Sequence, residues 1–141
     1  LAQLPSSSMK PTNFGQWLIT KLQSNEKVHI ITDEYSSPIT ADDFARSTLY
    51  LIQKNCNGIF HSAPLVNISR YNFSKSLAKS LGLNDKLIIP TTTAKLGRNV
   101  KTGRNKALDS KKLRETNFQF LTMEESFKLL KGQIKNDSFI F

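Results

Sequence analysis

The sequence has 141 residues, of which 38% are hydrophobic, and it carries a formal net charge of +9. This length favours one domain with its own core, and no apolar run approaches the ~20 residues that span a bilayer. Cys56 is the single cysteine, so an internal disulfide and a cysteine-based zinc site are excluded, and a reducing compartment, the cytoplasm, is expected. The positive charge favours a polyanionic partner such as nucleic acid, a membrane surface or a phosphorylated ligand.

The first half of the sequence indicates one helix before a strand and one helix after it. Residues 1–11 are typical of a loop, and a helix over residues 12–24 carries an apolar face that includes Trp17. Residues 27–32 predict a short strand and residues 33–39 a loop. Thr40 is expected to cap the next helix, with the Asp43 carboxylate returning a bond to the N–H of the cap. That helix has an apolar stripe at Phe44, Thr48, Leu51 and Ile52.

The second half predicts two more strands and three helices. Residues 58–62 (GIFHS) favour a buried strand, in which His61 would be a hydrogen-bonded core residue. A helix runs from Ser69 to a C-cap at Gly82, and the strand over residues 87–89 is expected to stop at Pro90. Residues 91–107 predict a loop, followed by a short helix to about residue 115. A last helix opens with a capping box at Thr122, and the tail at 136–141 has no assignment. This order indicates an α/β fold.

Positive charge is concentrated late in the chain. Residues 95–114 contain eight Lys or Arg residues and one acid, Asp109. Such a run is typical of a solvated loop and equally of a phosphate-binding edge. No G-x-G-x-x-G, P-loop or H-E-x-x-H motif is present. The residues alone therefore indicate a basic α/β domain that binds a phosphate-bearing ligand.

Four short motifs follow one another along the chain. They are Ser36-Ser37-Pro38 with Asp43-Phe44-Ala45, then Gly58-Ile59-Phe60-His61, then Ser69-Arg70-Tyr71-Asn72-Phe73, and finally RNKALDSKKL at residues 104–113. In this order they resemble the G-S-P-T and D-L-A, G-I-Y-H, S-x-Y-E-F and R-N-x-x-L-D-x-x-K-L segments of the dTDP-4-dehydrorhamnose reductase family, which are extended short-chain dehydrogenases. The resemblance runs from about residue 13 to about residue 130.

The resemblance implies the C-terminal portion of an NAD(P)-binding Rossmann-type fold, with a small substrate-binding subdomain. Residues 12–135 would form the sugar-nucleotide side of an NADPH-dependent reductase of rhamnose biosynthesis, which reduces a 4-keto sugar nucleotide. NADP would be bound mainly by the missing N-terminal half, which would also supply the catalytic Tyr. An Arg suits the substrate's diphosphate because its planar fork makes two charge-assisted bonds. The residues expected to contact substrate are Ser36, Ser37, Pro38, Thr40, Lys95, Arg98 and Arg104.

The sequence also departs from the family pattern. Thr102-Gly103 replaces the family's R-P pair, and Ile39 replaces the Thr of G-S-P-T. The family's Tyr-x-x-x-Lys lies in its N-terminal half, and the same spacing at Tyr50 and Tyr71 here is coincidental. No catalytic residue is therefore assigned, and residues 1–141 alone are not expected to transfer hydride.

Two alternatives stay open. The chain could belong to a non-catalytic regulatory relative of the family, or it could be a basic nucleic-acid-binding domain. The second is disfavoured because no aromatic residue interleaves with the charges between Phe73 and Phe118. A homodimer is possible, and no membrane partner is expected. The absence of an initial Met favours a partial chain, in which strand 28–32 and helix 41–54 would expose apolar surface meant for the missing half.

Overall fold

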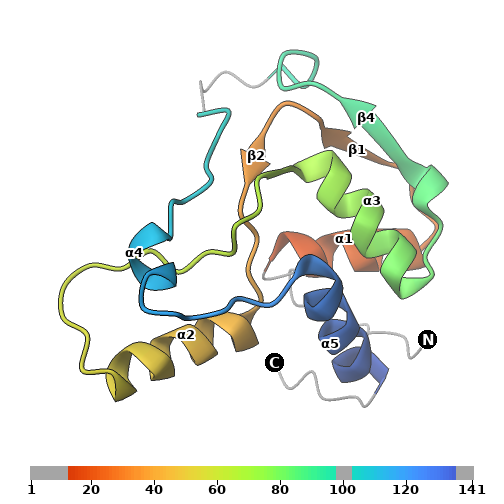
Figure 1. Ribbon diagram of the computed structural model, residues 1–141. Helices are drawn as coiled ribbons and strands as arrows, with labels where there is room; N and C mark the ends of the chain where they lie inside the picture. Colours follow the sequence, from red (N-terminus) through yellow and green to blue (C-terminus); the bar gives the residue numbers. More distant parts are fainter. Residues whose placement is uncertain (1–12, 98–102, 136–141) are drawn as a thin grey trace.

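The computed structural model of the chain describes residues 13–97 and 103–135, which form helices around two small sheets (Figure 1). The elements are α1 (Phe14–Gln23), β1 (Val28–Ile31), β2 (Tyr35–Ser36), α2 (Ala41–Gln53), β3 (Ile68–Ser69), α3 (Arg70–Leu81), the 3-10 helix η1 (Asp85–Leu87), β4 (Ile88–Thr91), α4 (Lys111–Arg114) and α5 (Met123–Lys135). Strand β1 pairs in parallel with β4, and β2 pairs antiparallel with β3. The predicted α/β class is confirmed. The loop at 1–11 and the tail at 136–141 lie outside the described residues.

The core is built around α3. This helix packs on β1 and β4, and it also contacts α1 and α5. Leu18 of α1 and Leu77 of α3 are completely or almost completely buried there, and Phe73 meets Phe127 of α5 edge to face at 5.6 Å between ring centres. Burying each such side chain contributes about 1.5–3 kcal/mol. Within the described ranges, none of the helices has the length and apolarity needed to cross a membrane.

The helix ends follow the sequence predictions. The Ser69 hydroxyl accepts a hydrogen bond from Asn72 N at 3.1 Å, and Gly82 ends α3 in the left-handed conformation with φ 72°. At the start of α5, Glu125 N donates to Thr122 Oγ1 at 3.2 Å, and Thr122 N donates to the Glu125 carboxylate at 2.7 Å. The backbone bond from Thr122 is the main reason that the pKa of Glu125 lies below its usual value.

The strand predicted at residues 58–62 is wrong. The segment has no strand partner, because the ladders among the described residues are β1–β4 and β2–β3. Ile59 is 84% exposed, and His61 is exposed rather than buried, with its ring Nδ1 3.0 Å from the Asp109 carbonyl oxygen. Lys112 holds the segment from the other side, since its Nζ donates to Ile59 O at 3.2 Å and lies 4.0 Å from the centre of the Phe60 ring.

Pro90 lies inside β4, where the prediction had it end the strand. It stands opposite Ile30 in the parallel register. The neighbouring Thr91 carbonyl points toward β1, since it accepts from Thr32 N at 2.9 Å. Alternation along a strand therefore turns the backbone of Pro90 toward the outer edge, where its missing N–H breaks no ladder bond.

Helix α2 stands apart from the α3 core (Figure 1). It carries exposed apolar side chains. Phe44 is 52% exposed and Ile52 is 66% exposed, which confirms the predicted exposed apolar surface for this helix. The same prediction is wrong for β1, because Val28, Ile30 and Ile31 are buried. They are covered within the chain itself, since β1 pairs with β4 and packs against α3 and α1.

Asp43 fixes α2 to the segment that precedes α5. Its backbone N donates to Thr40 Oγ1 at 3.3 Å, as predicted for a capped helix. Its carboxylate does not return to the cap, because it is 1% exposed and accepts from Leu121 N at 2.9 Å while pairing with Arg46. The Arg46 guanidinium in turn lies 5.5 Å from the centre of the Phe118 ring. Asp43, whose carboxylate was predicted to cap α2, thus connects α2 to the segment before α5.

Candidate functional site

The carboxyl ends of the parallel strands β1 and β4 are tied together by Asp33. Its carboxylate accepts from both the N–H and the hydroxyl of Thr93, each at 3.0 Å. The backbone bond from Thr93 is the main cause that lowers the pKa of Asp33, and the positive charge of Arg104 lowers it further. The charged carboxylate therefore holds the turn after β4, which carries the predicted site residue Lys95.

The basic segment joins the fold beside β2. Tyr35 N donates to the Arg104 carbonyl oxygen at 2.7 Å, and Lys106 N donates to the Tyr35 carbonyl oxygen at 2.9 Å. The Lys106 ammonium also pairs with the buried Glu34 at 3.1 Å. The bridge pairs Tyr35 with Asn105 in parallel, so Arg104 stands opposite Glu34, two positions along β2 from Ser36.

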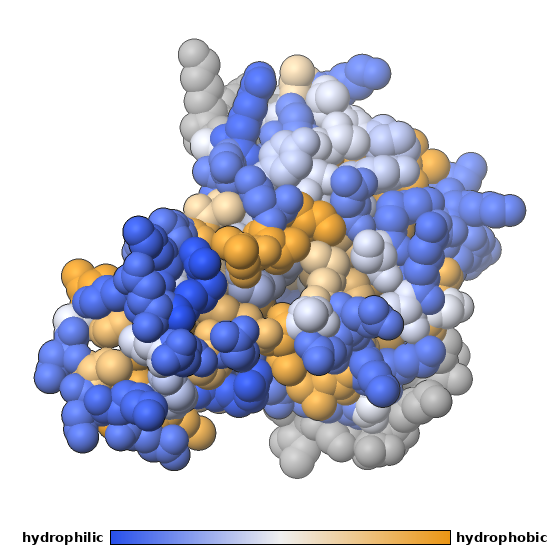
Figure 2. Space-filling view, viewed as in Figure 1, coloured by the Kyte–Doolittle hydropathy of each residue, from blue (hydrophilic) through white to orange (hydrophobic). Residues whose placement is uncertain are grey.

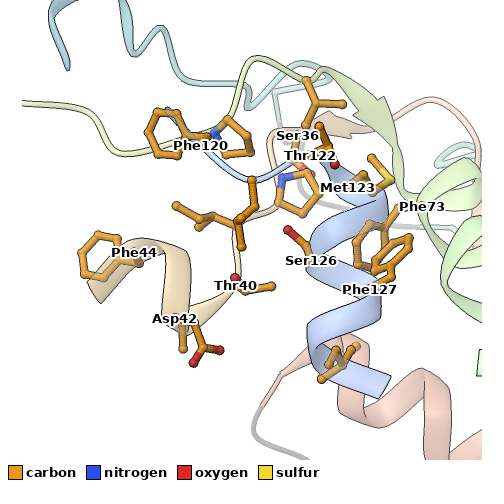
Figure 3. Close-up of a pocket in the computed structure, with 18 of the residues that line it drawn as sticks. Ser36, Thr40, Asp42, Phe44, Phe73, Phe120, Thr122, Met123, Ser126 and Phe127 are labelled. Carbon is orange, nitrogen blue, oxygen red and sulfur yellow. The ribbon is translucent and has the colours of Figure 1, made fainter. Parts of the chain in front are cut away.

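A groove of about 1260 Å³ runs between α2 and α5. Figure 2 shows hydrophobic side chains along this hollow, between the α2–α4 side and the α3–α5 side of the molecule. In Figure 3, Thr40 and Asp42 lie on the α2 side, while Ser126 and Phe127 lie opposite on α5. The volume exceeds the ~300–1,000 Å³ of ordinary small-molecule pockets, as expected for a groove that is open along one side.

The structure separates the predicted site residues into three sets. Ser36, Pro38 and Thr40 line the groove. The Ser37 hydroxyl is used within the fold, since it donates to the Val66 carbonyl oxygen at 2.5 Å.

The basic residues of the prediction stand elsewhere. Lys95 and Arg104 are exposed at the ends of the strands and do not line the groove. Arg98 lies outside the described residues. The role of each in binding stays a prediction.

Two arginines that were not among the predicted substrate contacts line the groove, and one of them, Arg114, belongs to the basic run at 95–114. Arg70 begins α3, and its guanidinium carbon lies 4.6 Å from the centre of the Phe14 ring. Arg114 ends α4, and its Nε is buried without a hydrogen-bond partner among the described residues. The run of positive charge at 95–114 led to the prediction of Lys95 and Arg104, which lie at the strand ends. A single Arg at the start of an amphipathic helix gave no comparable signal.

These features define an α/β domain with a largely apolar groove between α2 and α5, and with charged side chains at the carboxyl ends of the parallel strands β1 and β4. A family model described as the RmlD substrate binding domain matches residues 7–133. The chain belongs to this family, as the four motifs led us to expect.

Three relatives illustrate the likeness. A probable low-salt glycan biosynthesis reductase of Haloferax volcanii is 28% identical over 96 residues, which cover 68% of this chain and 32% of that protein. A dTDP-4-dehydrorhamnose reductase of Bacillus anthracis, solved in complex with NADP, has a TM-score of 0.76 and 20% identity over 86% of this chain and 43% of its own. The Clostridium acetobutylicum dTDP-4-dehydrorhamnose reductase has a TM-score of 0.72 and 23% identity over 92% and 45% of the two chains. The chain thus spans less than half of these relatives, and the structural likeness confirms the fold.

Proposed function

We propose that this chain is the substrate-binding part of an NADPH-dependent reductase that reduces a 4-keto sugar nucleotide. The family match over residues 7–133 is the observation that carries the proposal. The groove beside Ser36 and Thr40 supports it, because it offers an apolar wall with a few polar groups, as ligand sites commonly do. We place the protein in the cytoplasm, in rhamnose biosynthesis.

The cofactor does not fit this chain's own residues. The sequence has no glycine-rich dinucleotide motif. The described parallel pairing is the two-stranded β1–β4 sheet, and α3, which leads toward β4, begins with Ser69 and Arg70 rather than with glycines. We therefore assign no NADP contact here and expect the N-terminal part of the reductase fold to bind it. Bound there, NADPH would supply the hydride that reduces the C4 carbonyl, and a Tyr outside this chain would supply the proton for its oxygen.

This chain's residues would bind and orient the sugar nucleotide. Ser36 and Thr40 stand at the groove, and Lys95 and Arg104 supply positive charge at the adjoining strand ends. The groove is open, so we propose that the N-terminal half of the fold covers it together with the apolar face of α2. That contact would place the cofactor beside the sugar.

The test uses the native polypeptide that contains this chain. Its intact mass is measured first, and its thermal unfolding is then followed with NADPH, with a dTDP-4-keto sugar and with both. A product about twice this size, stabilised by both ligands and oxidising NADPH in the presence of the keto sugar, supports the proposal. Stabilisation by the ligands without NADPH oxidation would instead identify a non-catalytic relative. Binding to neither ligand would refute the assignment.

A further inference from the structure

Arg70 is a cation held in place at the groove, and it has no counter-ion within residues 13–97 and 103–135. The side chain is half-buried, and its guanidinium lies over the Phe14 ring. Phe14 is itself fixed, because it stacks on Trp17 at 5.7 Å and contacts Phe73 at 6.2 Å between ring centres. Among the described residues, no ion pair or side-chain hydrogen bond involves the Arg70 guanidinium.

Glu34, an acid that neighbours Arg70 in the fold, is committed to another group. Arg70 N donates to the Glu34 carbonyl oxygen at 3.0 Å, so the two residues are neighbours, yet the Glu34 carboxylate pairs with Lys106. The adjacent Asp33 carboxylate is occupied by Thr93. The described part of the chain therefore leaves the five N–H donors of Arg70 to water or to a ligand.

The groove as a whole favours an anion. Its described lining includes Arg70 and Arg114, against one carboxylate, Asp42. The Arg114 guanidinium is already paired with Asp109 at 3.5 Å, so Arg70 is the cation of this lining that carries the argument. Asp42 is exposed and accepts from the Gln133 side chain at 3.0 Å. Apolar walls lower the local dielectric and strengthen the attraction between a guanidinium and an anion. A side chain that is already immobilised also loses less entropy on binding.

We propose that Arg70 binds the diphosphate of the nucleotide-sugar ligand and so selects for ligands that carry it. The inference rests on the proposed function for the identity of the ligand. The planar guanidinium can make two parallel bonds to phosphate oxygens while its face stays on Phe14. Arg70 is then a specificity-determining residue outside the basic segment 95–114.

The test compares Arg70→Ala and Arg70→Lys with Lys79→Ala in the native polypeptide. Lys79→Ala is the matched control, because it removes the same charge from the exposed last turn of the same helix. Calorimetric titrations use dTDP, inorganic pyrophosphate and thymidine. For Arg70→Ala the Kd for dTDP and for pyrophosphate should rise about 10–100-fold, as expected from lost charge-assisted bonds. The Kd for thymidine should change less than about twofold. The Kd of Arg70→Lys for dTDP should lie between that of the wild type and that of Arg70→Ala.

The outcomes separate this inference from the proposed function. An unchanged Kd for dTDP in Arg70→Ala, or equal losses for dTDP and thymidine, overturns the role of Arg70 and leaves the reductase proposal standing. Binding of pyrophosphate through Arg70 in a protein that does not turn over any keto sugar supports the inference and removes the reductase. A polypeptide that binds neither dTDP nor pyrophosphate overturns both. Phe14→Leu provides a second variant, because it keeps the charge and removes the ring, and it should weaken dTDP binding less than Arg70→Ala.

Discussion

Replacement of Asp43 by Ala should release the segment before α5 from α2. The change leaves Leu121 N–H without its acceptor, which costs about 1–3 kcal/mol for a buried donor. The lost ion pair adds only about 0–1 kcal/mol, because the Arg46 side chain is 48% exposed. The expected loss is therefore about 2–3 kcal/mol. Asp43→Asn should lose about 1 kcal/mol, since an amide oxygen can still accept from Leu121 N.

Amide hydrogen exchange at Leu121 is the appropriate assay, because it reports on this local contact rather than on the whole fold. A loss of 2–3 kcal/mol should speed exchange about 30–160-fold, at about 1.36 kcal/mol for each tenfold step. Asp42→Ala is the control, as it removes a neighbouring exposed carboxylate from the same turn. If Leu121 exchanges equally fast in Asp43→Ala and Asp42→Ala, the buried carboxylate does not hold the segment and this reasoning fails.

Three further changes test the fold. Gly82→Ala should lower the free energy of unfolding in urea by about 1 kcal/mol, because φ at Gly82 is 72°. Gly132→Ala, inside α5 with open space around it, should be neutral or stabilising by up to about 1 kcal/mol. Equal effects of the two substitutions would contradict the left-handed cap. The pKa of Asp85 is lowered mainly by its hydrogen bond to Lys75, so the charged form contributes stability above the unfolded pKa and loses it on acidification. The stability difference between the wild type and Asp85→Asn should therefore shrink as the pH falls below about 4; a constant difference would refute the pairing. Phe127→Ala should cost about 3–5 kcal/mol by calorimetry, and less than 1 kcal/mol would show that its ring contact contributes little.

The helix ends could be predicted from the sequence because their partners are close in the chain. The Thr122–Glu125 box and the Ser69 cap each involve residues three apart, so local chemistry decides them. The segment at 58–62 could not be predicted in the same way. Its apolar alternation shows that a strand is possible, but pairing depends on a partner elsewhere in the chain, and the described residues supply none.

The site shows the same division between local and distant determinants. Ser36, Pro38 and Thr40 were expected at the site because they belong to a short motif that resembles the family's, and such a motif is a local pattern; the structure places all three along the groove. The groove it lines depends on α5, which is some eighty residues further along the chain, so its shape could not be predicted. Arg70 was missed for a related reason, since only the fold shows that its neighbouring acids are engaged elsewhere.

Pro90 limits how the β1–β4 sheet can associate with other molecules. A small sheet with an open edge can recruit a strand from a neighbouring copy, which begins aggregation. The backbone of Pro90 faces the outer edge of β4 and offers no N–H to an incoming strand. A proline near the middle of a four-residue strand leaves too few donors for a regular ladder. The sheet is therefore not extended beyond β4 by a strand of a neighbouring copy, which protects this edge from self-association.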